Sequence, residues 1–266
     1  ELGYVFHKWV GSAGIGVQVI GPTTTSYSDL NNNSLCLWVL VDGGWYSFGT
    51  PSNSIQNNVW HHIAATYGDG TVSLYIDGVA QEINSSGDIS GPIADHSEVN
   101  LAIGGPNQTG GSSQFFNGSI DELRFWNDVR TQEQIFELMS SEITGSEESL
   151  VGYWNFNEGE GNTLTDLSGN GNDGTINSAT WSGDGAPVDP PVYGYGCTDS
   201  YAGNFDPDAN SDDGSCAGYP DNGDYSLSFD GVDDHVTVNN FEGSFPTFSF
   251  TTRAFINSSG PSYSTL

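Results

Sequence analysis

Residues 59–78, with the sequence VWHHIAATYGDGTVSLYIDG, contain two strand-like segments, each followed by an Asp-Gly pair. In the second segment Val72, Leu74 and Ile76 occupy every second position, and a period of two residues places them on one face of a β-strand. Asp-Gly pairs favour tight hairpin turns because both residues tolerate positive φ angles. The stretch therefore predicts a β-hairpin.

Similar strand signals, separated by Gly, Asn and Asp turns, recur along the first half of the chain. Some segments are apolar on both faces, such as residues 35–41 (LCLWVLV), whereas others alternate. Two stacked sheets produce this mixture. We therefore expect an all-β sandwich with strands at residues 14–20, 35–41, 45–48, 59–67, 71–76, 99–103 and 119–126.

One short helix is predicted after these strands. Thr131 and Gln134 match a capping box, and Ile135, Leu138 and Met139 form one apolar stripe. Because the helix is short, we expect it to pack on the sandwich and not to form a separate domain.

The composition is strongly acidic, with a net charge of −30 from 34 acidic and 4 basic residues among 266. Such a surface repels nucleic acid and anionic membranes. No apolar run approaches the roughly 20 residues of a membrane helix. We therefore expect no nucleic-acid partner and no membrane insertion. The charge suits an extracellular protein in calcium-rich water, and solubility alone is the alternative explanation.

The three cysteines differ in their surroundings. Cys36 lies in an apolar strand, which predicts a buried free thiol. Cys197 and Cys216 flank a short acidic segment, and a bridge between them would imply an oxidising, extracytoplasmic setting. Metal binding by this pair is the weaker alternative, because no second cysteine pair or nearby histidine completes a zinc site.

Several segments together resemble the laminin-G-like, concanavalin A-like jelly-roll family. Residues 59–78 are similar to its central hairpin, residues 117–126 (NGSIDELRFW) to a later strand, and residues 227–238 (LSFDGVDDHVTV) to its opening strand pair. Residues 151–181 resemble a segment that frames such domains in bacterial surface proteins. The resemblance implies a concanavalin A-like jelly-roll sandwich with one short helix. It implies little about the ligand, because the family includes lectins, adhesion modules and passive spacers.

Residues 196–216 (GCTDSYAGNFDPDANSDDGSC) resemble a short repeat of secreted Bacteroidetes proteins, in which it sits between larger modules. The resemblance implies an extracellular or cell-surface location and a small acidic loop module closed by the Cys197–Cys216 disulfide. Crowded carboxylates repel one another unless a cation neutralises them, and oxygen-rich spacing suits Ca²⁺. The candidate calcium ligands are Asp199, Asp206, Asp208, Asn210, Asp212 and Asp213. The alternative is a solvated acidic turn held by the disulfide, which alone would stabilise a loop of this size by about 3 kcal/mol.

Two further acidic turns have the residue types of cation sites. The weaker calcium candidate consists of Asp166, Asn170, Asn172 and Asp173. Its alternative is turn chemistry, because Gly, Asn and Asp are the residues that tight turns use. The other turn consists of Asp230, Asp233 and Asp234, and we expect it to be solvated.

The sequence argues against an enzyme. Glycoside hydrolases of related fold use two carboxylates that flank one bond. Asp121 and Glu122 are adjacent in a predicted strand, so they should point to opposite faces. His61 and His62 lie near no serine or cysteine that suggests nucleophilic catalysis, and we expect them to be structural.

The ends of the chain look out of phase with the fold. Residues 225–266 predict the first strands of a jelly roll, which residues 1–182 lack. The expected division is 1–182 jelly roll, 183–195 linker, 196–216 cysteine loop, 217–224 linker and 225–266 opening strands. The partner strands of residues 225–266 could come from a neighbouring chain, from covalent continuation of the polypeptide, or from the same chain by permutation.

Two functions follow as hypotheses. The first is a structural or adhesive repeat of a secreted surface filament or adhesin, stabilised by calcium, with neighbouring repeats or subunits as partners. The alternative is a carbohydrate-binding module of a larger secreted enzyme. In that case exposed aromatic residues such as Trp45, Tyr46 and Trp181 would stack on surface glycans, although burial also explains any one of them.

Overall fold

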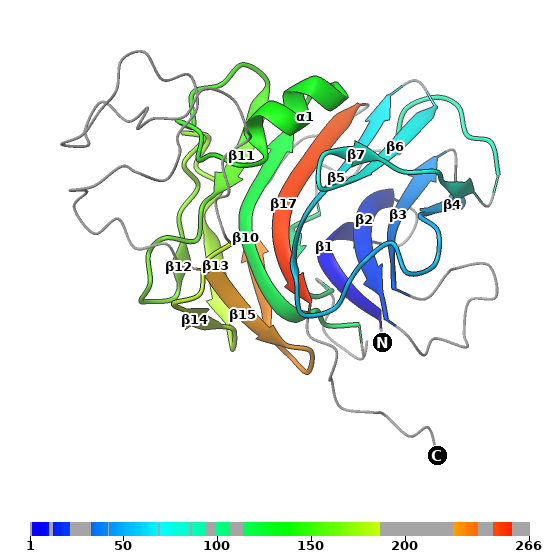
Figure 1. Ribbon diagram of the computed structural model, residues 1–266. Coiled ribbons are helices and arrows are strands. Elements are labelled where there is room, and N and C mark those ends of the chain that lie inside the picture. Colours follow the sequence, from blue (N-terminus) through cyan, green and yellow to red (C-terminus); the bar gives the residue numbers. More distant parts are fainter. Residues whose placement is uncertain are drawn as a thin grey trace, which may run out of the picture.

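In the computed structural model, two antiparallel sheets stack face to face and one helix lies outside them (Figure 1). The predicted all-β jelly-roll sandwich with one short helix is therefore confirmed. The structure describes residues 2–10, 13–21, 33–41, 43–68, 70–85, 87–93, 99–106, 114–186, 226–238 and 247–256.

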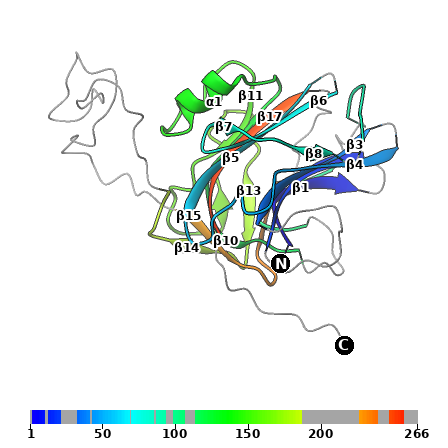
Figure 2. The ribbon, with the colours of Figure 1, turned by 45° about the vertical axis from the view of Figure 1, so that its right-hand side comes forward.

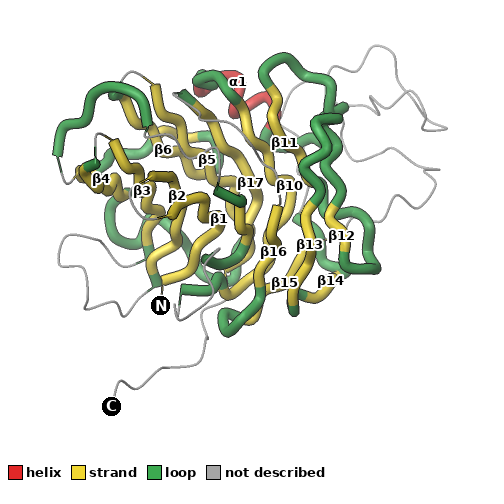
Figure 3. The backbone as a smooth tube through the Cα atoms, turned by 180° about the vertical axis from the view of Figure 1, so that it is seen from behind, coloured by secondary structure: helices red, strands yellow, loops and turns green. Residues whose placement is uncertain are grey.

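The two sheets are called sheet A and sheet B. Figure 3 views them from the side opposite to Figure 1. Sheet A consists of β12 (Thr163–Leu164), β13 (Gly174–Asn177), β16 (His235–Val238), β9 (Leu101–Ile103), β1 (Leu2–Val10), β2 (Ala13–Ile20), β3 (Ser34–Val41), β4 (Gly44–Gly49) and β8 (Asn84–Ser85). Sheet B consists of β14 (Thr180–Ser182), β15 (Ser226–Asp230), β10 (Asn117–Trp126), β17 (Phe248–Ile256), β5 (Trp60–Gly68), β6 (Thr71–Ile76) and β7 (Val79–Ala80), with β11 (Leu150–Trp154) also paired to β10.

The predicted hairpin forms β5 and β6 of sheet B. Ile63 lies opposite Ile76, and both belong to the core, as the two-residue period predicts. The turn between the strands requires Gly70, whose φ of +79° lies in the left-handed region. A Cβ at this position would collide with the Ile89 carbonyl oxygen, so the turn fixes the register of the hairpin.

The helix α1 (Gln132–Leu138) packs on the outer face of sheet B (Figure 2). The predicted capping box is present: the Gln134 backbone N–H donates to the Thr131 hydroxyl at 3.3 Å, and the Thr131 N–H donates to the Gln134 side chain at 2.9 Å. Ile135 is the buried residue of the helix and packs against Ala64 and Tyr75.

The strands of the C-terminal segment lie inside the two sheets of their own chain. β15 lies between β14 and β10, β16 between β13 and β9, and β17 between β10 and β5. In Figure 1, β17 is the red strand in the middle of sheet B. Of the three sources of partner strands that the sequence left open, this arrangement corresponds to the same chain by permutation. Both edges of β17 are hydrogen-bonded within the chain, so the described segment leaves no half-sandwich to be completed.

The long connection before this segment joins two adjacent strands of one sheet. Ser182 at the end of β14 is paired with Ser226 at the start of β15. The described residues on the two sides of this connection therefore lie side by side in sheet B. The cysteine segment, residues 196–216, falls within this connection in the sequence and lies outside the described residues. The backbone N–H of Ala186 donates to the Asp121 carboxylate at 2.9 Å and fixes the start of the connection to β10.

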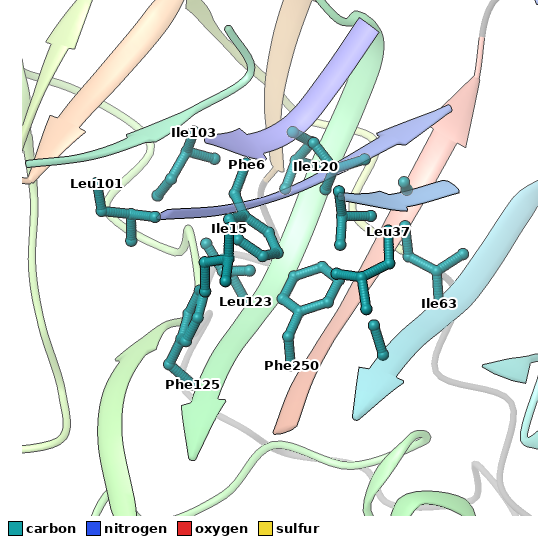
Figure 4. Packing of buried hydrophobic residues seen from close by; sticks show 14 of the residues in the cluster. Phe6, Ile15, Leu37, Ile63, Leu101, Ile103, Ile120, Leu123, Phe125 and Phe250 are labelled. Atoms are coloured by element: carbon teal, nitrogen blue, oxygen red, sulfur yellow. The ribbon is translucent and has the colours of Figure 1, made fainter. Parts of the chain in front are cut away.

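The first and last described strands meet in the core. Phe6 of β1 packs against Phe250 of β17, with ring centroids 4.7 Å apart, and against Phe125 of β10 at 4.9 Å (Figure 4). Phe6 and Phe250 are fully buried, and Phe125 is 1% exposed. Aromatic pairs at these separations add to the free energy of burial. The C-terminal segment is thus a part of the core.

We expect the substitution Phe250→Ala to lower the free energy of unfolding by about 3–5 kcal/mol, because it leaves a cavity between the sheets. Urea denaturation measures the change. Phe136→Ala is the control, since Phe136 is 38% exposed on α1, and its cost should stay within about 1 kcal/mol. Equal costs for the two variants would show that β17 does not occupy the core.

Candidate functional site

Gln18 of β2 and Trp38 of β3 lie on the face of sheet A that is turned away from the core. Their chain neighbours on both sides belong to the core cluster. Because successive side chains of a strand point to opposite faces, Gln18 and Trp38 share the outer face. The Trp38 indole Nε1 donates to the Gln18 side-chain oxygen at 2.7 Å. The two side chains therefore form one polar pair across neighbouring strands.

This hydrogen bond fixes the orientation of the Gln18 amide. The indole N–H can only donate, so the end of the amide that faces it must be the oxygen. The other end, Nε2, has no hydrogen-bond partner among the described residues, although Gln18 is only 2% exposed. A buried donor without an acceptor costs about 1–3 kcal/mol. A bound molecule with an acceptor oxygen would remove that cost.

Aromatic side chains extend this pair across the strands β1 to β4. Tyr4 lies opposite Gln18 in the neighbouring strand, and its ring packs edge-to-face against His7 at 4.8 Å. Trp45 is 41% exposed on the same outer face. We call Tyr4, His7, Gln18, Trp38 and Trp45 the outer strip. Aromatic rings with a few placed polar groups are typical of small-molecule sites.

The three aromatic residues named above as candidates for stacking on sugars differ in their exposure. Trp45 is exposed, whereas Tyr46 and Trp181 pack against the core cluster. Sequence reasoning missed Gln18 and Trp38. The available signal was their place between apolar residues in the strings VQV and LWV, which puts each on the face opposite to the core.

A buried ionic network lies on the outer face of sheet B, beneath α1. Arg124 donates to the Glu122 carboxylate and to the backbone carbonyls of Leu138, at 2.6 Å, and Ser141. The Tyr153 hydroxyl donates to the same carboxylate at 3.1 Å. Burial raises the pKa of the Glu122 carboxyl, and the Arg124 guanidinium opposes this rise. The network ties the end of α1 to β10 and has a structural role.

The expectation that Asp121 and Glu122 point to opposite faces is wrong, because β10 contains a bulge at this point. Ile120 and Leu123 both belong to the core, so two residues instead of one separate successive core-facing side chains. Glu122 takes a φ of +54° there. The Asp121 carboxylate accepts hydrogen bonds from the backbone N–H groups of Glu122 and Ala186. Both acids are buried, and their described contacts are structural.

The histidine pair connects the start of β5 to the turn after β6. The His61 Nδ1 lies 2.9 Å from an Asp77 carboxylate oxygen, and the other oxygen accepts from the His62 backbone N–H. His61 Nε2 lies 3.0 Å from the backbone nitrogen of Gln56. The His61 ring thus bonds a turn carboxylate and the backbone, whereas His62 contributes its backbone N–H to the same carboxylate.

The structure brings Asp166, Asn170, Asn172 and Asp173 together as a hydrogen-bonded turn. The Asp166 carboxylate accepts three backbone N–H groups, and the Asp173 carboxylate accepts the Asp166 N–H at 2.9 Å. The side-chain nitrogens of Asn170 and Asn172 donate to the Val151 carbonyl. These contacts match the turn chemistry that the sequence had left as the alternative to calcium.

The acidic turn between β15 and β16 gathers carboxylates more closely. Asp230, Asp233 and Asp234 each place a carboxylate oxygen within 4.8 Å of the others. Asp230 and Asp233 are exposed, as expected of a solvated turn, whereas Asp234 is 5% exposed. Burial raises the pKa of Asp234, and the Asp230 charge adds to the rise. The donor set suits a hard cation such as Ca²⁺.

The cysteines divide between the described residues and the rest of the chain. Cys36 is a buried free thiol, as predicted, and burial raises its pKa to about 12. The predicted disulfide of Cys197 and Cys216 lies outside the described residues. The same holds for the candidate calcium ligands Asp199, Asp206, Asp208, Asn210, Asp212 and Asp213. These assignments stay predictions.

Residues 8–136 match the laminin G family model described as "Concanavalin A-like lectin/glucanases superfamily". The matched residues cover the hairpin and the first part of α1. Neither the curated proteins nor the solved structures gave a significant match. No helix in the described part of the chain is long and apolar enough to cross a membrane.

We expect Arg124→Met to lower the free energy of unfolding by about 3–5 kcal/mol, because it leaves the buried Glu122 carboxylate unpaired. Arg130→Met is the matched control. Arg130 lies over the Trp126 ring at 3.7 Å and bonds the Glu148 carbonyl, and its loss should cost about 1 kcal/mol. Chemical denaturation gives both values.

A second variant separates the ionic role of Arg124 from its packing. If Arg124 serves to neutralise Glu122, then Glu122→Gln in the Arg124→Met background should restore about 1–2 kcal/mol. A double variant that is less stable than Arg124→Met alone would contradict this role.

Proposed function

We propose that this chain is a non-catalytic adhesion domain of a secreted bacterial surface protein, and that it binds glycans at the outer strip of sheet A. The unpartnered Gln18 amide nitrogen beside Trp38 is the observation that carries this proposal. Sugars offer hydroxyl and ring oxygens as acceptors, and their C–H faces can stack on exposed rings such as Trp45. The superfamily match also supports it, because the superfamily includes lectins.

A binding role is favoured over hydrolysis because of the acids on β10. Glycoside hydrolysis needs two carboxylates about 5–10 Å apart on either side of the scissile bond. Asp121 and Glu122 are buried in contacts with the backbone, Arg124 and Tyr153. A carbohydrate-binding module of a larger secreted enzyme is the second candidate, and the outer strip would serve it in the same way.

The extracellular setting and the repeated arrangement belong to this proposal. Laminin-G-like domains are commonly extracellular, and residues 196–216 resemble a repeat of secreted Bacteroidetes proteins. Neighbouring copies would then be partners as whole sandwiches in a tandem array. Strand complementation loses its physical reason, since β15, β16 and β17 pair within the chain.

We expect Trp45→Ala to weaken glycan binding about tenfold or more, because it removes the exposed stacking surface. A glycan array with calcium present identifies the ligand, and calorimetry with that glycan measures the change. Phe136→Ala is the control, because Phe136 is similarly exposed but lies on α1 at the other sheet. An array without any bound glycan would overturn the proposed function.

Calcium is the proposed cofactor of the acidic cysteine loop. At 100 times its dissociation constant it should add about 2.7 kcal/mol to the stability of whichever part it holds folded. We expect the double substitution of Asp206→Asn and Asp208→Asn to abolish the calcium-dependent rise in melting temperature, and Asp233→Asn to leave it. The opposite pattern would place the cation at the turn between β15 and β16.

A further inference from the structure

We infer that the outer strip selects uncharged glycans and rejects sulfated or carboxylated ones. This inference rests on the proposed function and adds the class of ligand. It follows from where the few cationic side chains of this chain are used. Recognition of sulfate or carboxylate groups depends on Lys and Arg, whose N–H groups bond both oxygens of the anion.

The chain has four cationic side chains, and the structure describes three of them. Lys8 is fully buried and donates from its Nζ to the Val99 carbonyl. Arg124 is 2% exposed and bonds the Glu122 carboxylate. These two cations are therefore buried in contacts within the chain.

Of the remaining two basic residues, Arg130 has a described side chain and Arg253 has only a described backbone. The Arg130 side chain is 12% exposed, lies over the Trp126 ring and donates to the Glu148 carbonyl at 2.9 Å. The backbone of Arg253 lies in β17, where it pairs with His62 and Asp121. The outer strip thus has no Lys or Arg among the described residues of its own face.

The donor of the strip that has no partner among the described residues is a neutral amide. The Gln18 amide nitrogen suits a hydroxyl or ring oxygen, and the Trp38 hydrogen bond holds it in place. A neutral amide gains much less from a sulfate than a guanidinium does. An anionic ligand would also meet the field of a chain with a net charge of −30, which slows encounter and weakens binding. A neutral glycan meets neither cost.

The test compares neutral polysaccharides with sulfated and carboxymethylated forms prepared from the same polymers. The panel includes a β-glucan, a xylan, a mannan and a galactan, and affinity electrophoresis measures binding. We expect at least one neutral polymer to bind, and its charged forms to bind about tenfold more weakly or not at all. Binding of the neutral polymer should change little between about 50 and 500 mM NaCl, because screening acts on charges.

Tighter binding of the charged forms, with an affinity that falls as salt rises, would overturn the inference and leave the proposed glycan-binding function standing. Binding to no polymer of either kind would overturn the proposed function, and the inference with it. The two failures are therefore distinguishable.

A gain-of-function variant gives an independent readout. Ser47 of β4 lies opposite Trp38, on the outer face of sheet A. Ser47→Lys introduces one cation beside the strip, and should improve binding of the sulfated polymer about fivefold relative to its neutral parent. Ser47→Gln is the control for side-chain size. A Lys variant that leaves the ratio of the two affinities unchanged would count against the inference, because charge would then not limit binding at the strip.

Discussion

The contact between the Phe6 ring of β1 and the Phe250 ring of β17 is the interaction on which the sandwich depends. β17 connects β10 to β5, so without it sheet B would separate into two smaller parts. Phe250 also covers Phe6 in the middle of sheet A. Two sheets with one apolar face each are stable only when these faces cover each other. The C-terminal strands therefore complete the core instead of forming a second unit.

The closed core leaves two outer faces that differ in character. On sheet B, α1 and the Arg124 network cover the surface, and Arg124 bonds Glu122 and the Leu138 carbonyl while its Nε has no partner among the described residues. On sheet A, the outer strip holds the Gln18 amide, one of whose donors is buried and has no acceptor in the described part of the chain. Buried polar groups are nearly always satisfied in native proteins, so each such atom, the Gln18 Nε2 among them, calls for an explanation by a ligand or solvent.

The sequence predicts local features well and long-range pairing poorly. The capping box of Thr131 and Gln134 and the hairpin turn at Gly70 depend on residues close in the chain. By contrast, the Gln18–Trp38 pair depends on the register of β2 against β3, and a slip of one residue would put each side chain on the other face. The bulge at Glu122 is also invisible to pattern reasoning, because it breaks the two-residue period within an otherwise regular strand.

The small number of cations explains both the acidic net charge and the lack of Lys and Arg among the described residues of the outer strip. The chain has only four cations, and those with described side chains pair with a buried carboxylate or donate to a backbone carbonyl. Arg124 does both, since it neutralises Glu122 and satisfies the carbonyls that follow α1. Removing one partner of a buried ion pair destabilises the fold by more than an exposed ion pair stabilises it. Recognition on the outer face is consequently left to amide and indole groups, which bind through shape and neutral hydrogen bonds.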